Sequence, residues 1–139
     1  MYEPKLFRDR SRLAQVVLGG VVPALVGGLA GVLIGASAAA YWGVAVLAAI
    51  GAFVGGFEHR DGWGGADRGF VGGLIYGIAL LLIHALVGTH AKVSLGGFPP
   101  LLVVVTAIIG MLLLAAGGRI ARLRRQRAGA ASSGVPAQP

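Results

Sequence analysis

The chain has 139 residues, of which 56% are hydrophobic and only 12% are charged, with a formal net charge of +7. A soluble domain carries about 25% charged residues, so these side chains are too few to cover a water-exposed surface, and the apolar content is too high for a disordered chain. The chain contains no cysteine, which excludes disulfides and thiolate metal sites. Composition therefore predicts a small integral membrane protein.

Four apolar segments are long enough to cross the roughly 30 Å hydrocarbon core of a bilayer. They cover about residues 13–35, 40–57, 69–88 and 99–117. The sequence thus predicts an all-α bundle of four transmembrane helices in a single domain, 1–127. A short Ala/Ser segment around Ser37 predicts a tight first hairpin, and a polar, Gly-rich loop is expected from Glu58 to Arg68. Residues 128–139 lack apolar periodicity and are expected to form a disordered tail.

The first span admits a second interpretation. Its basic start, its apolar run and the triplet Ala36-Ser37-Ala38 resemble a secretory signal with its cleavage site. The run from 13 to 35 is longer than the roughly 7–15 residues of a signal core, which favours a retained span. Pro23 removes one hydrogen bond within this span and is expected to bend the helix.

The cations gather at the chain ends and between the second and third spans. Apart from Lys92, they are Lys5, Arg8, Arg10, Arg12, Arg60, Arg68, Arg119, Arg122, Arg124, Arg125 and Arg127. Four spans place all of these on one side, so the positive-inside rule predicts that both termini are cytoplasmic. The richness in Arg, Ala and Gly favours a bacterial source, and thus the inner (plasma) membrane.

The last five arginines follow the fourth span as a basic helix. Each cation near an anionic leaflet contributes about 1 kcal/mol to membrane binding. We therefore expect Arg119, Arg122, Arg124, Arg125 and Arg127 to face anionic lipids of the inner leaflet. Because the membrane accounts for these charges, no nucleic-acid partner is expected.

Glycines recur every four residues in three of the spans. Lipid tails are as apolar as Leu, so membrane helices associate through close packing and interhelical hydrogen bonds, which small residues promote. The pattern predicts packing grooves, but does not tell whether a neighbouring span or another subunit fills them. The predicted packing residues are Gly27, Gly31, Gly35, Gly51, Gly55, Gly69, Gly73 and Gly77.

Few residues are candidates for a catalytic or ligand-binding site. His84 is the one ionisable residue within a span. It is either a proton or ligand site, or it hydrogen-bonds a neighbour or reaches for the membrane interface. Glu58, His59 and Asp61 form the densest polar cluster. Adjacent residues make no pre-formed metal cage and two arginines oppose a cation, so we expect loop charges that pair with one another and no metal. Hydrolase, metalloprotease and nucleotide-binding motifs are absent from the sequence, so neither an enzyme nor a cofactor is expected.

The stretch from Gly55-Gly56-Phe57 to Arg68-Gly69-Phe70-Val71-Gly72-Gly73-Leu74-Ile75-Tyr76 resembles a pattern of small, Gly-rich, four-span bacterial membrane proteins of unknown function. In these proteins the second span ends in Gly-Gly, a short basic loop follows, and a Gly-rich, Tyr-containing segment opens the third span. Their last span ends in Gly-Gly, here Gly117-Gly118. The resemblance covers roughly the second half of the chain and implies the four-span architecture without an activity.

Two hypotheses for function follow. The first is a non-enzymatic assembly or accessory protein whose Gly-rich faces contact a second copy or a larger membrane partner. The alternative is a small oligomeric channel or permease, which would show a polar stripe along a span. The candidates for such a stripe are scattered over different helices, which favours assembly: Gln15, Ser37, Tyr76, His84 and Thr106.

Overall fold

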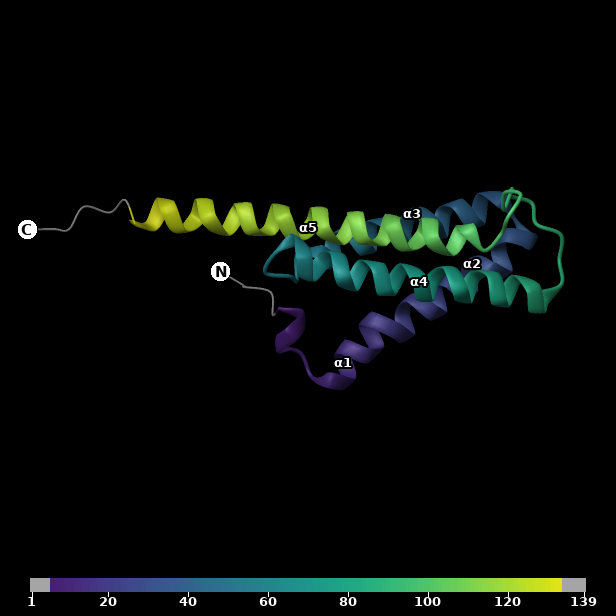
Figure 1. Ribbon diagram of the computed structural model, residues 1–139, viewed down its shortest axis with the longest axis horizontal. Coiled ribbons are helices and arrows are strands. Elements are labelled where there is room, and N and C mark those ends of the chain that lie inside the picture. Colours follow the sequence, from purple (N-terminus) through teal and green to yellow (C-terminus); the bar gives the residue numbers. More distant parts are fainter. Residues whose placement is uncertain (1–5, 134–139) are drawn as a thin grey trace, which may run out of the picture.

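The computed structural model describes residues 6–133, and every regular element among them is helical (Figure 1). In chain order these are η1 (Phe7–Asp9), α1 (Arg12–Val16), η2 (Val17–Val21), α2 (Val22–Ala36), α3 (Ala38–Gly56), α4 (Gly62–Val87) and α5 (Leu101–Ser133). Four stretches are long and apolar enough to cross a membrane: Arg12–Ala36, Ala38–Gly56, Gly62–Val87 and Leu101–Gly129. The predicted all-α, four-span architecture is confirmed, and the chain is a multi-pass membrane protein.

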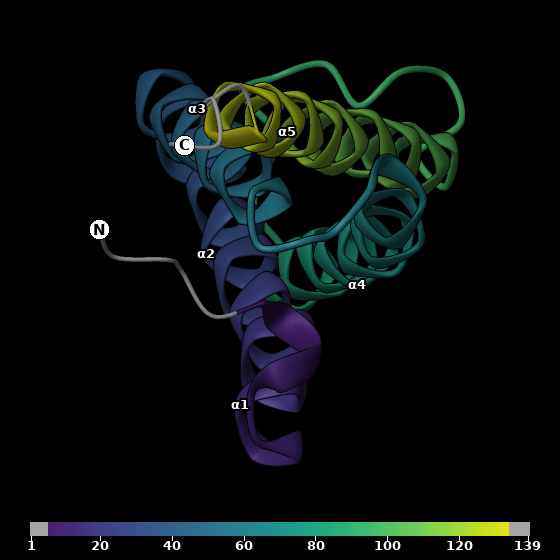
Figure 2. The ribbon, with the colours of Figure 1, turned by 90° about the vertical axis from the view of Figure 1, so that its left-hand side faces the viewer.

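The four spans are packed around a close pair formed by α4 and α5. α2 lies against the other side of α4, while α3 lies against α5 and α2 (Figure 2). The first span crosses α4 obliquely, so that α2 contacts α4 whereas α1 projects away from the bundle (Figure 1). The bundle is thus closed along α2, α4, α5 and α3 and open beside α1.

Two predicted boundaries differ from the structure. Residues 62–68 were expected in a loop but form the start of α4. The Asp61 carboxylate accepts a hydrogen bond from the Gly64 backbone N–H at 2.9 Å, which caps this helix seven residues earlier than the apolar pattern begins. α5 continues through the expected disordered residues 128–133, while residues 134–139 lie outside the described part of the chain.

The first hairpin is as tight as predicted, because Ser37 alone separates α2 from α3. Its backbone is extended, and its hydroxyl accepts a hydrogen bond from the Ala40 N–H at 3.3 Å, which caps α3. Pro23 lies in the first turn of α2, directly after the π-helical turn η2. Pro lacks an N–H and crowds the carbonyl four residues earlier, and the wider π-turn accommodates both effects.

Large side chains contribute little to the interior. Among the described residues, Ile34 and Leu80 are the largest fully buried side chains, and they form a cluster with Ala30 and Tyr41. Many apolar side chains point outward instead, as Leu86 does with 73% of its surface exposed. An exposed apolar surface of this kind suits lipid tails and leaves the contact between helices to small residues.

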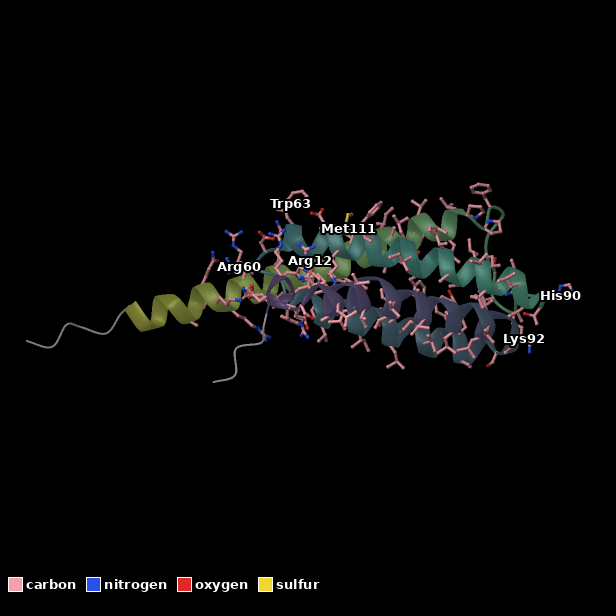
Figure 3. The ribbon with its side chains drawn as sticks, turned by 90° about the horizontal axis from the view of Figure 1, so that it is seen from below. Arg12, Arg60, Trp63, His90, Lys92 and Met111 are labelled. Carbon is pink, nitrogen blue, oxygen red and sulfur yellow. The ribbon has the colours of Figure 1, made fainter. Side chains whose placement is uncertain are left out.

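The two ends of the bundle differ in charge. Arg12 and Arg60 lie at one end with Trp63, while His90 and Lys92 lie at the other (Figure 3). Lys92 is bound to the end of α2: its backbone N–H donates to the Ile34 carbonyl and its ammonium donates to the Ala36 carbonyl, both at 2.8 Å. A cation there is favoured by the negative end of the helix dipole. The arginine-rich end is hereafter called the basic end.

Candidate functional site

The glycines of the first span pack against α4. A Cβ atom added at Gly27 would lie 2.9 Å from the Tyr76 Cα, and one at Gly31 would lie 3.1 Å from the His84 backbone nitrogen. Both distances are too short for ordinary contact. Gly35 is equally close to Thr89, in the loop after α4. Gly27 and Gly31 therefore let the backbones of the first span and α4 meet within one chain, while Gly35 makes room for the Thr89 side chain.

The glycines of α4 face α5 in the same way. Added Cβ atoms at Gly69, Gly73 and Gly77 would lie 2.9, 2.7 and 2.8 Å from Cα atoms of Met111, Ala107 and Val103 respectively. The hydroxyl of Thr106 donates to the Gly73 carbonyl at 2.9 Å, across the same interface. Backbone approach and an interhelical hydrogen bond therefore act together at the centre of the bundle.

Several packing glycines were missed from the sequence. Gly56 of α3 meets Gly117 of α5, since a Cβ added at Gly56 would lie 2.8 Å from the Gly117 Cα. Gly65 and Gly110 make similar contacts between α4 and α5, and Gly118 meets Asp61. Extending the four-residue spacing back from Gly69 would have found Gly65. The others follow no such row, and only the arrangement of the helices reveals them.

The glycine row of α3 is different. A Cβ atom added at Gly51 or Gly55 would have no neighbour within 4 Å. The same holds for Gly43, about two helical turns before Gly51. The apolar side chains of Leu47 and Ile50 on this helix are 68% and 55% exposed. We call Gly43, Leu47, Gly51 and Gly55, spaced four residues apart, the open face of α3. This face has the spacing of a packing groove without an occupant from its own chain.

The ionisable candidates are not brought together. His84 lies in the last turn of α4, whereas Glu58, His59 and Asp61 precede its first turn. Within residues 6–133, Nδ1 of His84 is shielded from solvent and has no hydrogen-bond partner. This atom makes no hydrogen bond among the described residues, and His84 is not part of the polar cluster at the basic end.

The polar loop is held by the N-terminal segment. The Phe7 N–H donates to the Glu58 carbonyl at 2.9 Å, and the Arg10 guanidinium forms an ion pair with the Glu58 carboxylate at 2.8 Å. Gln15 donates to the Arg10 carbonyl at 2.9 Å, which fixes the entry into α1. Glu58 thus pairs with a residue 48 positions away and not with a charge of its own loop.

His59 is a buried residue in this loop, with 7% of its surface exposed. Its Nδ1 lies 3.3 Å from the Gly55 carbonyl oxygen, and its ring stacks on that of Phe7 with centroids 5.7 Å apart. Burial lowers the pKa of the His59 imidazole below its usual 6.5, and the positive charge of Arg68 lowers this pKa further. The folded protein therefore favours the neutral ring.

A dependence of stability on pH follows. Folding lowers the pKa of His59, so below about pH 6.5 the unfolded chain binds more protons than the folded chain. The contribution of neutral His59 to the free energy of unfolding is therefore complete above that pH and is lost below it. We expect the free energy of unfolding to fall by up to about 1.4 kcal/mol per pH unit in this range. Thermal unfolding in detergent at several pH values measures the slope. The His59→Gln variant, which cannot titrate, should show a smaller slope, and equal slopes would contradict the expectation.

Arg68 packs its guanidinium against an aromatic ring. Its Cζ lies 3.4 Å from the centroid of the Phe7 ring, a cation–π geometry. Nη1 of Arg68 and Nε of Arg10 are shielded from solvent and lack hydrogen-bond partners within the described residues. Two guanidiniums face the single carboxylate of Glu58, so positive charge is in excess at this point.

The remaining loop acid and the basic segment have structural contacts. Asp61 caps α4, and no group of three possible metal-ligating side chains occurs in residues 6–133. Arg125 donates to the carbonyls of His59 and Phe57, at 2.9 and 3.3 Å, and Arg124 lies 5.7 Å from the Phe57 ring. These two of the five expected lipid-facing arginines therefore also bind α5 to the loop after α3.

A groove of about 580 Å³ opens at the basic end, where α1 diverges from α4. We call it the lateral groove. It is lined by Phe7, Arg12, Gln15, Val16, Gly19, Asp67, Arg68 and Val71. Towards the middle of the bundle, α4 and the first span come together again where a Cβ atom added at Gly72 would lie 3.7 Å from Pro23.

No family model, no curated protein and no solved structure matches this chain. The resemblance of residues 55–76 to small four-span bacterial proteins therefore stays a prediction.

Proposed function

We propose that this protein is a non-enzymatic assembly or accessory protein of a bacterial inner membrane, which contacts a second copy or a larger membrane protein through the open face of α3. It needs no cofactor for this role. The observation that carries the proposal is the contrast between glycine rows. Those of the first span and α4 are filled by helices of the same chain, whereas Gly51 and Gly55 have no neighbour within 4 Å.

The exposure of α3 supports this assignment. Only Tyr41 and Gly56 of this helix are buried, at its two ends. Between them, Gly43, Gly51 and Gly55 share one strip with the exposed side chain of Leu47, and the exposed side chains of Val46, Ile50 and Val54 flank it. A small-residue strip bordered by branched apolar side chains allows a second helix to approach closely, so van der Waals packing stabilises the pair in lipid.

Native mass spectrometry of protein extracted gently from its own membranes tests the proposal. We expect a homo-oligomer or a stoichiometric complex, and we expect Gly51→Leu to release the monomer because its side chain fills the open face. The thermal stability of the monomer should not fall, since Gly51 has no neighbour to displace. Leu82→Ile, on an outward side chain of α4 with 56% exposure, is the control. A wild-type monomer, or a complex unaffected by Gly51→Leu, would refute the proposal.

We further propose that both termini are cytoplasmic. The support is the distribution of charge, since Arg12 and Arg60 lie at the end opposite to Lys92 (Figure 3). The chain has no native cysteine, so single cysteines can be labelled selectively. In intact cells a membrane-impermeant maleimide should label Ser94→Cys, whereas Arg60→Cys should react only after permeabilisation. The reverse pattern would invert the orientation.

The channel hypothesis has less support. The polar side chains that a pore would need hold the fold instead: Thr106 bonds to Gly73, Ser37 caps α3 and Gln15 bonds to the backbone of the N-terminal segment. Flux in liposomes that is present in wild type and lost in His84→Ala would reverse this ranking.

A further inference from the structure

We propose that the lateral groove binds one anionic phospholipid, with the lipid phosphate on Arg68 and Arg12 and an acyl chain along Val16, Gly19 and Val71. This site is separate from the open face of α3, and it concerns a bound lipid and not a protein partner. It also differs from the general attraction of the C-terminal arginines to a charged leaflet, because it is an open groove between α1 and α4 that Arg12 and Arg68 line.

The shape of the groove suits a lipid tail. Its volume of about 580 Å³ lies within the roughly 300–1,000 Å³ of small-molecule sites. Gly19 contributes a wall without a side chain, and a Cβ added there would lie 3.8 Å from the Phe7 ring, in ordinary contact. Beyond the groove, towards the middle of the bundle, a Cβ added at Gly72 would lie 3.7 Å from Pro23, so the first span and α4 are close there. The groove therefore accepts an apolar chain that enters from the basic end.

The charge of the groove selects the headgroup. Two guanidiniums, of Arg12 and Arg68, line it against one carboxylate, of Asp67. Glu58, the other acid nearby, is already paired with Arg10. Arg68 and the exposed Arg12 both line the groove, and phosphate oxygens match the guanidinium geometry.

The groove lies at the end of the bundle where lipid headgroups are expected. It opens at the basic end, where Trp63 is 82% exposed and the arginines of the described chain gather. Exposed Trp side chains and arginines are characteristic of the boundary between the hydrocarbon and the headgroups. A phosphate at this level reaches Arg68 and Arg12 while its acyl chain follows the groove inward. These features together favour a membrane phospholipid over a soluble phosphate compound.

Competitive lipid retention tests the proposal. The full chain, purified in neutral detergent, is mixed with equal amounts of phosphatidylglycerol and phosphatidylcholine with the same acyl chains. The lipid that remains bound is then measured by native mass spectrometry. We expect wild type to retain one phosphatidylglycerol in preference to phosphatidylcholine. Arg68→Gln should weaken this retention about tenfold, the effect of losing one charged hydrogen bond.

Two further variants separate charge, shape and folding. Arg122→Gln removes the same charge from an exposed position on α5 and should retain phosphatidylglycerol as wild type does. Gly19→Leu keeps both arginines but fills the apolar wall, so retention should also fall. This variant keeps the proposal testable if Arg68→Gln does not fold. Equal retention of the two lipids by wild type, or unchanged retention in folded Gly19→Leu or Arg68→Gln, would overturn the proposal.

Discussion

Gly73→Ile is expected to destabilise the folded bundle by about 3 kcal/mol or more, at the upper end of what overpacking costs. The new Cβ would lie 2.7 Å from the Ala107 Cα and closer still to the Thr106 carbonyl. Both neighbours are backbone, so a rotamer change cannot relieve the contact. α4 and α5 must therefore separate along their closest approach.

Separation of these helices removes a second interaction. The Thr106 hydroxyl donates to the Gly73 carbonyl at 2.9 Å, and this interhelical hydrogen bond cannot survive a wider spacing. The Val103 carbonyl of its own helix lies 3.0 Å from the same hydroxyl and accepts its one proton after separation, so the hydroxyl remains partnered. The loss of packing should consequently dominate the effect, with the hydrogen bond as a smaller contribution.

Thermal unfolding in detergent, followed by circular dichroism, measures the change. Gly51→Ile introduces the same side chain into an α3 position with no neighbour within 4 Å and should leave the unfolding midpoint of the monomer unchanged or higher. Leu82→Ile controls for a β-branched side chain in α4. If Gly73→Ile unfolds at the wild-type temperature, the helices do not meet through this glycine.

The helical spans were predictable because bilayer thickness imposes a length of about 20 apolar residues on each of them. Their ends were less predictable, since polar capping sets them. Asp61 begins α4 well before its apolar stretch, and a helix-capping carboxylate followed by Gly-rich sequence carries little hydrophobic signal. Ser37 was easier to locate, as it interrupts two long apolar runs.

The contacts at the basic end could not be predicted from the sequence. Arg10 pairs with Glu58 across 48 positions, and Phe7 brings together the ring of His59 and the guanidinium of Arg68. These residues share no spacing, because the pairing depends on how the N-terminal segment folds back along the bundle. Only the density of charge around residues 58–61 singled out this region in the sequence as a candidate site.

Glycine spacing identified packing helices without identifying the surface that each glycine faces. Gly55 and Gly56 are adjacent in the sequence, yet Gly55 has open space around it while Gly56 meets α5. Successive residues of a helix point about 100° apart, so two adjacent glycines can face different surroundings. Gly51 and Gly55 therefore face away from the bundle, whereas Gly56 faces α5 within it.

This difference makes the pair a matched test of the fold. Gly56→Ala is expected to lower the free energy of unfolding by about 1–3 kcal/mol, since its Cβ would lie 2.8 Å from the Gly117 Cα and 3.0 Å from the Gly118 nitrogen. Gly55→Ala should instead leave stability unchanged or raise it by about 0.5–1 kcal/mol, because Ala has the higher helix propensity. Thermal unfolding of both variants in the same detergent compares them directly.

A double variant shows whether Gly56 acts through α5. Gly117→Ala should destabilise the bundle for the same reason, as its Cβ would lie 3.0 Å from the Gly56 Cα. Once either methyl group has pushed α3 and α5 apart, the second meets less resistance, so the combined loss should be smaller than the sum of the two single losses. Gly55→Ala combined with Gly117→Ala should be additive, since Gly55 has no contact with α5. Strict additivity in both pairs would mean that Gly56 and Gly117 do not touch, and the α3–α5 interface would then have to lie on another face of α3.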